Sequence, residues 1–158
     1  MDDTRLIAWD RELRAAHAKL RAALAVVRDS LDSDADGRPD ASSDPLRELT
    51  LYCIGFCTAL DAHHRSEDAG LFPELRAEHP DLGPVIDKLM QDHSMLAHLL
   101  SALRTAAESG ADRAELHRHL GGINAIMESH FAYEERQLLA PLATLRSEES
   151  VGRLLGPL

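Results

Sequence analysis

The sequence predicts an all-α protein that folds as an antiparallel up-down-up-down four-helix bundle. Four long stretches place apolar residues at intervals of three and four, which is the period of one helix face. Short segments rich in Gly, Pro, Asp and Ser separate these stretches, and short connections of this kind join antiparallel neighbours in bundles. Few segments are rich in β-branched residues, so a sheet is not expected. A length of 158 residues suits a single domain.

The first helix is expected at about residues 3–31, and an acidic loop is expected at 32–44. The inward face of the helix carries Leu6, Trp9, Leu13, His17, Leu20, Leu24, Val27 and Leu31. The loop opens with DSDADG, which matches the first half of a calcium-binding EF-hand loop. Ser43 stands where that loop needs Glu, and Pro39 takes its apolar position, so calcium binding is not predicted.

The second helix is expected to begin at Pro45, with Asp44 as its N-cap. Pro73 lacks a backbone donor and should kink or end this helix. The third helix should run from about 82 to 108, and Gly110 should close it.

The fourth helix is expected at about 112–145, where Pro141 plays the same part as the proline that ends the second helix. The last residues, about 147–158, are expected to form a flexible tail. Cys53 and Cys57 lie one helical turn apart, a poor arrangement for a disulfide, so they are expected to be small buried core residues.

Charge and hydropathy exclude several classes of function. The net charge is −10, which argues against nucleic acid or an anionic membrane surface as a partner. No apolar stretch approaches the roughly 20 residues that span a bilayer. The start of the chain is charged and amphipathic, so no signal peptide is predicted and a cytoplasmic location is expected.

Titratable residues interrupt the apolar stripe of every predicted helix, in a pattern that occurs twice. Each half of the chain carries a histidine followed later by His-x-x-x-Glu. A titratable group on an inward face is costly unless it has a partner. Four imidazoles and two carboxylates inside one bundle therefore predict a pair of metal ions. The six predicted ligands are His17, His63, Glu67, His93, His130 and Glu134.

The four histidines are expected at similar depth in the bundle. His17 lies about 14 residues before the end of its helix and His63 about 18 residues into the next, so at about 1.5 Å per residue their depths differ by about 6 Å. His93 and His130 show the same offset, about 15 residues against about 19. Both differences are small enough for the connecting loops to absorb.

The His-x-x-x-Glu spacing suits a dinuclear site. Residues four apart share one helix face, so the imidazole can bind one ion while the carboxylate bridges to a second. Mixed imidazole and carboxylate ligation with open positions favours iron, with manganese as the less favoured metal, over a closed zinc site.

A competing frame on the second helix pairs His64 with Asp68. Both lie about 100° from the apolar stripe, so His63 with Glu67 is preferred. His64 could still reach the second metal from the flank, or else lie beside the ligands. Tyr52 and Tyr133 could supply a phenolate, but their positions off the stripe or far along the helix favour packing roles.

Four segments resemble the hemerythrin-like domain, also called the HHE cation-binding domain. They are AAHAKL around His17, HHRSEDAGLFPEL around His63, QDHSML around His93 and HFAYEERQLLAPL around His130. The similarity covers nearly the whole chain except the acidic loop and the tail. It implies a non-haem centre of two iron ions, bridged by carboxylates and an oxo or hydroxo group, that binds O₂ or related small ligands.

The sequence departs from the oxygen-carrying members of this family at two positions. Those proteins have a further histidine in the third helix, where this chain has Ala97. They have His-x-x-x-x-Asp in the fourth helix, where this chain has His130-x-x-x-Glu134 followed by Glu135. A missing imidazole leaves a coordination position for water, peroxide, NO or another side chain.

Sensing of, or reaction with, O₂, peroxide or NO is therefore expected rather than oxygen carriage. The expected partner is a small diatomic molecule or peroxide. Two alternatives remain: an enzyme that decomposes peroxide, and a protein of iron storage or delivery. No nucleophile triad is readable in the sequence.

Overall fold

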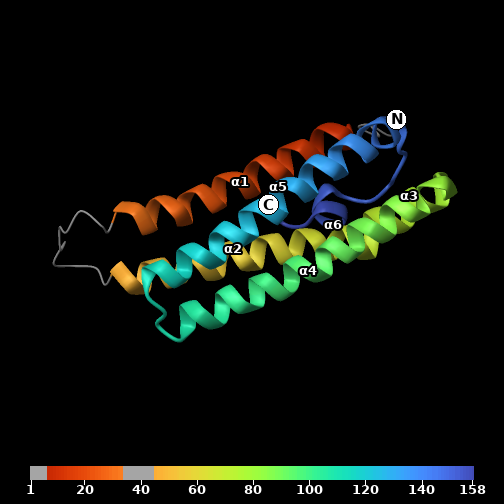
Figure 1. Ribbon diagram of the computed structural model, residues 1–158. Helices are drawn as coiled ribbons and strands as arrows, with labels where there is room; N and C mark the ends of the chain where they lie inside the picture. Colours follow the sequence, from red (N-terminus) through yellow and green to blue (C-terminus); the bar gives the residue numbers. More distant parts are fainter. Residues whose placement is uncertain (1–6, 34–44) are drawn as a thin grey trace.

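Helices make up all the regular secondary structure in the part of the chain that the structure describes. The computed structural model describes residues 7–33 and 45–158, and these ranges contain no strand (Figure 1). This content confirms the all-α class. In chain order the elements are α1 (Trp9–Ser33), α2 (Pro45–Ser66), the π-helical turn η2 (Glu67–Leu71), α3 (Phe72–Glu78), the 3-10 turn η3 (Pro80–Leu82), α4 (Gly83–Glu108), α5 (Arg113–Thr144) and α6 (Val151–Leu155).

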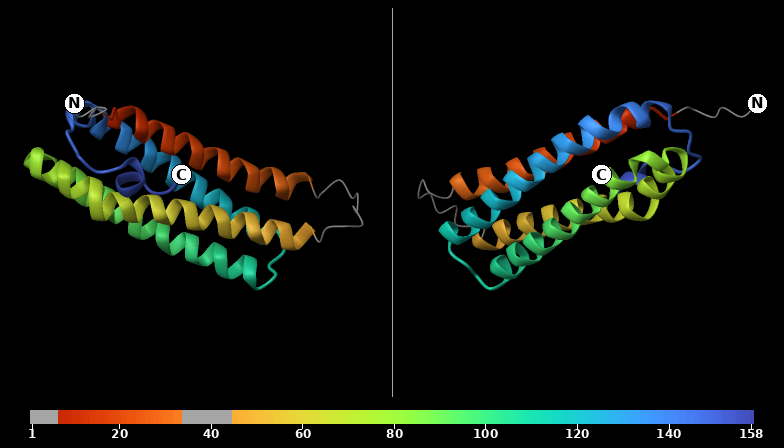
Figure 2. Two further views of the ribbon diagram at one scale, coloured as in Figure 1. Left: turned by 180° about the vertical axis from the view of Figure 1, so that it is seen from behind. Right: turned by 45° about the vertical axis from the view of Figure 1, so that its right-hand side comes forward.

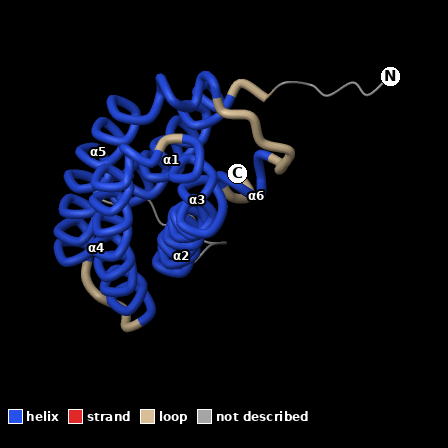
Figure 3. The backbone as a smooth tube through the Cα atoms, turned by 90° about the vertical axis from the view of Figure 1, so that its right-hand side faces the viewer, coloured by secondary structure: helices blue, strands red, loops and turns tan. Residues whose placement is uncertain are grey.

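The four long helices lie side by side, and each runs opposite to the one before it in the chain (Figure 1 and Figure 2). α1 packs against α2 and α5, and α4 packs against the same two helices. The helices therefore surround a common interior, which Figure 3 views along the bundle. The predicted helical residues 3–6 and most of the predicted acidic loop, 34–44 with Asp44, lie outside the described residues.

Short-range capping explains the turn between α4 and α5. Gly110 has a φ of 72°, a left-handed conformation that glycine adopts without a Cβ penalty. The N–H of Ala111 donates to the carbonyl of Ala106 at 3.0 Å, which satisfies an end group of α4. Asp112 then caps α5, because its Oδ1 accepts the backbone N–H of Glu115 at 2.9 Å. The prediction that Gly110 closes the third helix is confirmed.

The helical path of α2 continues past the position where an end or kink was expected. The backbone N–H of Phe72 donates to the carbonyl of Glu67, five residues earlier, which is the hydrogen bond of a π-helix. Pro73 follows directly, in the first turn of α3, where a missing N–H is tolerated. The chain therefore stays helical through Pro73 to Glu78. The departure from regular α-helix lies in the π-turn, just before the proline.

Two buried apolar clusters fill the interior. On each long helix, buried polar residues lie at the boundary between one cluster and the other. The turn-side cluster, near the α4–α5 turn, includes Leu20, Leu24, Leu31, Leu49, Phe56, Leu60, Leu96, Leu103, Leu120, Met127 and Phe131. The α6-side cluster includes Trp9, Leu13, Leu71, Phe72, Leu75, Ile86, Leu89, Leu138, Leu142, Leu154 and Leu155.

The end of the chain differs from the flexible tail expected at about 147–158. It contains the helix α6, whose Leu154 and Leu155 belong to the α6-side cluster at 0% and 1% exposure. Ser150 caps the helix by accepting the backbone N–H of Arg153 at 3.2 Å. A helix of five residues spans little more than one turn, so hydrophobic periodicity cannot reveal it.

Leu89→Ala is expected to lower the free energy of unfolding by about 2–5 kcal/mol, because Leu89 is fully buried in the α6-side cluster. Leu51→Ala is the matched control: Leu51 is 60% exposed on α2, and its change should stay within about 0.5 kcal/mol. Urea unfolding in the presence of a chelator measures both values without a contribution from metal. Equal losses for the two variants would contradict the described core.

Candidate metal centre

The four long helices and the π-turn bring a set of buried polar side chains to one level of the bundle. All six residues predicted from the sequence are in this set, and each is at most 4% exposed. One further histidine, His64, joins them at 4%. By element, they are His17 on α1, His63 and His64 on α2, Glu67 on η2, His93 on α4, and His130 and Glu134 on α5.

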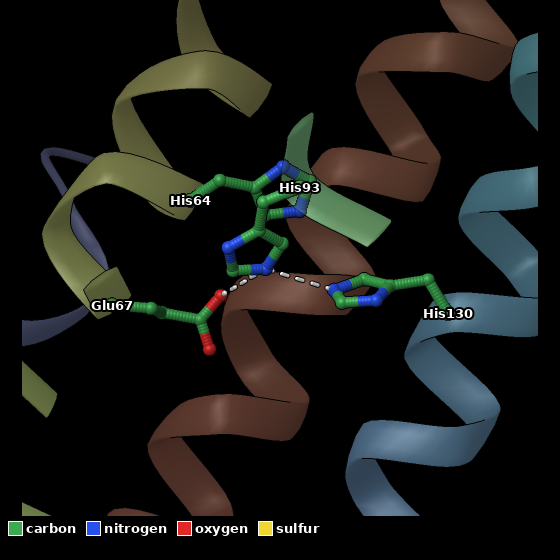
Figure 4. Close-up of side chains that lie close together, drawn as sticks. All are labelled: His64, Glu67, His93 and His130. Carbon is green, nitrogen blue, oxygen red and sulfur yellow. Dashed lines mark hydrogen bonds and ion pairs between the residues drawn. The ribbon is translucent and has the colours of Figure 1, made fainter. Parts of the chain in front are cut away.

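The first group consists of His64, Glu67, His93 and His130, which come from α2, η2, α4 and α5 (Figure 4). One ligand atom from each lies within 4.8 Å of all the others. The Nε2 atoms of His93 and His130 are 3.0 Å apart, and Glu67 Oε1 lies 3.7 Å from His93 Nε2. The ring of His64 stacks on that of His93 with centroids 3.9 Å apart. Their nitrogen and oxygen atoms thus lie close enough together to bind one cation.

The second group consists of His17, His63 and Glu134, whose ligand atoms also lie within 4.8 Å of one another. Glu134 Oε1 is 3.5 Å from His17 Nε2, and Glu134 Oε2 is 3.1 Å from His130 Nε2 in the first group. Glu67 makes the reciprocal link, because its Oε1 lies 3.0 Å from His63 Nε2. Each carboxylate therefore faces histidines of both groups.

Many of these polar atoms have no hydrogen-bond partner among the described residues. They include the Nε2 atoms of His17, His63 and His64 and both carboxylate oxygens of Glu67 and of Glu134. The close His63–Glu67 approach lacks the angles of a hydrogen bond. Leaving one buried polar atom unpaired costs about 1–3 kcal/mol, so this concentration is unfavourable unless something else binds it. The side chains fit cations, because a cation accepts the lone pairs of carboxylate oxygens and imidazole nitrogens.

Hydrogen-bond acceptors at Nδ1, the ring nitrogen that points away from the two groups, orient three of the imidazoles. His93 Nδ1 donates to Asp68 Oδ1 at 2.7 Å, and His130 Nδ1 lies 3.2 Å from Asp92 Oδ2. His63 Nδ1 donates to the Leu155 carbonyl at 2.6 Å. An acceptor at Nδ1 directs the Nε2 atom of each ring toward the interior, which is the usual support of a metal-binding histidine.

Aromatic rings close the space behind the histidines. Phe131 stacks on His17 with centroids 3.8 Å apart and planes 8° apart. Phe72 lies nearly parallel to His93 at 5.5 Å. These contacts hold the imidazole planes from the side that the ligand atoms do not use, and they keep water from the rings.

Burial determines the charge of His63 and His64 in the absence of metal. It lowers the pKa of His63 to about 4, and the neighbouring Glu134 only partly offsets this effect. Burial also lowers the pKa of His64 well below its usual value, and nearby imidazoles, His93 first, lower it further. Both rings are therefore neutral at pH 7, which is the form that ligates metals.

The two buried carboxylates titrate as a pair. Burial, followed by repulsion from Glu134, raises the pKa of Glu67 well above its usual value. Burial also acts to raise the pKa of Glu134, but interactions with Glu67, His130 and His17 outweigh it and leave the pKa well below the usual value. The metal-free pair therefore retains one proton, on Glu67, and cations binding between the carboxylates would displace it.

A single apolar stripe on α2 favours His63 over His64 as a ligand, but the structure buries both residues. α2 packs against both α1 and α4, so two adjacent faces of the helix point into the bundle. His63 takes the face of the second group and His64 that of the first, while Asp68 reaches His93. Two adjacent histidines, each with an acid four residues later, are the signal in the sequence that both frames are used.

The other candidates lie outside both groups. Tyr52 is 43% exposed, and Tyr133 packs beside the α6-side cluster with Lys88 Nζ 4.4 Å from its ring centroid. Cys53 and Cys57 are free and buried, and burial raises the pKa of each thiol to about 11. The two cysteines are core residues, as predicted.

Metal-free protein is expected to lose stability as the pH falls from about 6.5 to about 4, because unfolding lets His63 take up a proton that the folded state refuses in this range. His63→Gln should reduce this loss by about 2–3 kcal/mol between pH 7 and pH 4.5. The comparison isolates His63, since His130 titrates in both proteins. Urea unfolding at the two pH values, with chelator present, measures the difference, and parallel losses in the two proteins would contradict it.

Comparison with known proteins places these residues in a family. The family model described as the Hemerythrin HHE cation binding domain matches residues 10–142, a range that contains every residue of both groups. A search of curated proteins and a search of solved structures each gave no significant match. None of the described helices is long and apolar enough to cross a membrane. The match covers most of the chain, and the chain therefore belongs to the hemerythrin HHE cation-binding domain family.

Proposed function

We propose that this protein, as an antiparallel four-helix bundle of its family, holds two iron ions and binds or reacts with O₂, peroxide or NO in a sensing or stress role. One observation carries the proposal. Two buried groups of ligand atoms lie next to each other and share the carboxylates of Glu67 and Glu134. Such sharing suits two ions rather than one, because each carboxylate can contact both.

The two groups would hold their ions with different ligand sets. The first offers three imidazoles, from His64, His93 and His130, and the second offers two, from His17 and His63. His64 on α2 thus makes up for the imidazole that Ala97 lacks in α4, where the alanine is exposed. The smaller set leaves the second ion with more open positions, so we assign small-ligand binding to that ion.

The ligand chemistry supports iron. Imidazoles and carboxylates together suit iron or manganese, whereas the soft thiolates that favour copper(I) or closed zinc sites are absent from both groups. Two cations held in adjacent groups would repel each other, and the two shared carboxylates, with an oxo or hydroxo bridge, would offset the repulsion. Manganese is the less favoured alternative because the first group is rich in imidazole.

The surroundings of the centre restrict what can reach it. When bound, iron supplies one-electron redox chemistry and coordination of small ligands. The protein contributes five imidazoles, two carboxylates and the aromatic wall of Phe131 and Phe72. The near-complete burial of these groups excludes bulky substrates and favours molecules of two to four atoms.

One observation favours peroxide decomposition as a second candidate. Glu135 is 22% exposed, and its Oε1 lies 3.8 Å from His17 Nδ1. A carboxylate that contacts both solvent and the second group can relay protons. Decomposition of two peroxide molecules to O₂ and two waters moves two electrons and two protons from one peroxide to the other, so it needs such a relay. Arg21 Nη2 lies 4.0 Å from Glu135 Oε2 and would orient this carboxylate beside the second group.

Protein grown with iron and manganese both available is expected to contain two iron ions per chain. His130→Ala should retain at most one, because the Nε2 of His130 lies within reach of both His93 and Glu134. His119→Ala is the control, since His119 lies on the same helix but in neither group, and it should retain two. Elemental analysis with circular dichroism on each variant measures content and folding. Two irons at full occupancy in His130→Ala would refute the ligand assignment.

Adding peroxide to the iron-loaded protein is expected to change its near-ultraviolet spectrum, and His63→Ala should abolish the change because the second group then keeps one imidazole. Absence of any spectral response to peroxide, NO or O₂ would contradict the proposed ligand chemistry.

Sustained release of O₂ from peroxide, slowed about tenfold or more by Glu135→Gln, would identify the protein as the peroxide-decomposing enzyme instead. An oxygen electrode separates the two results.

A further inference from the structure

The C-terminal segment, residues 150–158, lies against the second group although it falls outside the family match at 10–142. It contains α6 and the main-chain carbonyl of Leu155, which accepts the Nδ1 proton of His63 at 2.6 Å. The acceptors on His93 and His130 are carboxylates carried by η2 and α4. Only His63, among the three imidazoles supported in this way within the described residues, depends on the end of the chain.

Glycine lets this segment approach the backbone of α2. Gly156 has a φ of 92°, which L side chains rarely adopt. A Cβ at this position would lie 3.0 Å from the Cα and 3.1 Å from the N of His63. Any side chain at position 156 would therefore meet rigid backbone beside His63 and push the segment away.

Further contacts hold the segment in place. A Cβ on Gly70 of the π-turn would lie 2.7 Å from Leu154 Cδ2, so the glycine makes room for the buried leucine. At the other end, Lys19 Nζ donates to the Leu158 main-chain oxygen at 3.1 Å and ties the segment to α1. The segment thus contacts both helices that supply histidines to the second group.

The Leu155 carbonyl also selects one form of His63. A neutral imidazole carries its proton on either Nδ1 or Nε2, and only the Nδ1–H form presents an Nε2 lone pair. A carbonyl can accept but not donate, so at 2.6 Å it holds the proton on Nδ1. The lone pair of His63 Nε2 then faces the interior, where Glu67 Oε1 lies 3.0 Å away.

We propose that the C-terminal segment supports metal binding at the second group. The Leu155 carbonyl is the positioning group that fixes the tautomer and orientation of His63. This inference rests on the proposed function, because it assumes that the second group holds an ion. Displacing the segment weakens metal binding at the second group and leaves the first group, supported by Asp68 and Asp92, intact. Loss of an outer partner of this kind typically lowers metal affinity 10–100-fold.

Gly156→Ala in the full chain tests the proposal, with two matched controls. Gly110→Ala also places a side chain on a residue of positive φ, at 72°, but its Cβ would meet nothing within 4 Å. Gly152→Ala changes the C-terminal segment itself at a position where a Cβ also meets nothing within 4 Å. Anaerobic titration of the metal-free proteins with Fe²⁺, against a competing chelator, gives the number and affinity of the sites.

Two sites are expected in the parent chain and in both controls. Gly156→Ala is expected to keep one site unchanged and to weaken the other by about 10–100-fold. Two sites of parental affinity in Gly156→Ala would overturn the inference and leave the proposed function standing. Equal weakening of both sites would also overturn it, because the segment would then only support the fold. No iron bound by the parent chain would instead overturn the proposed function.

Nitrogen NMR of the metal-free proteins provides a readout that needs no metal. His63 is expected as the Nδ1–H tautomer in the parent chain and as a mixture of tautomers in Gly156→Ala. Leu154→Ala is a second variant in case the first does not fold, since it removes the side chain that packs at Gly70. A single Nδ1–H tautomer in a folded variant with α6 displaced would refute the positioning role of Leu155.

Discussion

A layer of buried titratable side chains, enclosed between two apolar clusters, is the constraint on which the rest of this structure depends. Every long helix contributes at least one of these side chains, and each is at most 4% exposed. Without cations the layer opposes folding, because carboxylate oxygens and imidazole nitrogens are removed from water without hydrogen bonds in return. With cations the same lone pairs become metal bonds that join all four helices. Stability and the proposed function therefore depend on the same atoms. Metal that binds the folded state but not the unfolded state would stabilise the fold.

The outer partners make the two halves of the layer unequal. Asp68 and Asp92 carry negative charge next to His93 and His130, whereas His63 meets a neutral carbonyl. A carboxylate partner makes an imidazole a stronger electron donor than a carbonyl does. Under the proposed function, the first group, with more imidazoles and charged support, would retain its ion firmly, and the second would exchange small ligands. This division follows from the hydrogen bonds at Nδ1 of the histidines, on the opposite side of each ring from the ligand atom Nε2.

Hydrophobic periodicity was sufficient to predict the helical class, the long helices and the burial of the six proposed ligands, because it reports which face of a long helix is buried. It failed where burial did not follow one stripe. α2 contacts neighbours on two sides, so His64 is buried about 100° away from His63. α6 is too short to show a period, and its burial depends on Gly70 and Gly156, whose roles appear only when distant segments meet. Pro73 predicted an interruption, but sequence alone did not show that the chain would absorb it in a π-turn.

That π-turn connects the fold to the centre. Glu67 is the first residue of the π-turn. The main-chain carbonyl of Glu67 accepts the N–H of Phe72, and the Glu67 side chain lies between the two groups. A π-turn inserts one residue relative to a regular helix, which shifts the buried face, and Leu71 and Phe72 are both buried although they are adjacent. Leu71 and Phe72 both join the α6-side cluster, and Phe72 also covers His93. The irregular turn thus lets one short stretch of chain supply a shared carboxylate, an outer partner for His93 and two apolar groups that close the site.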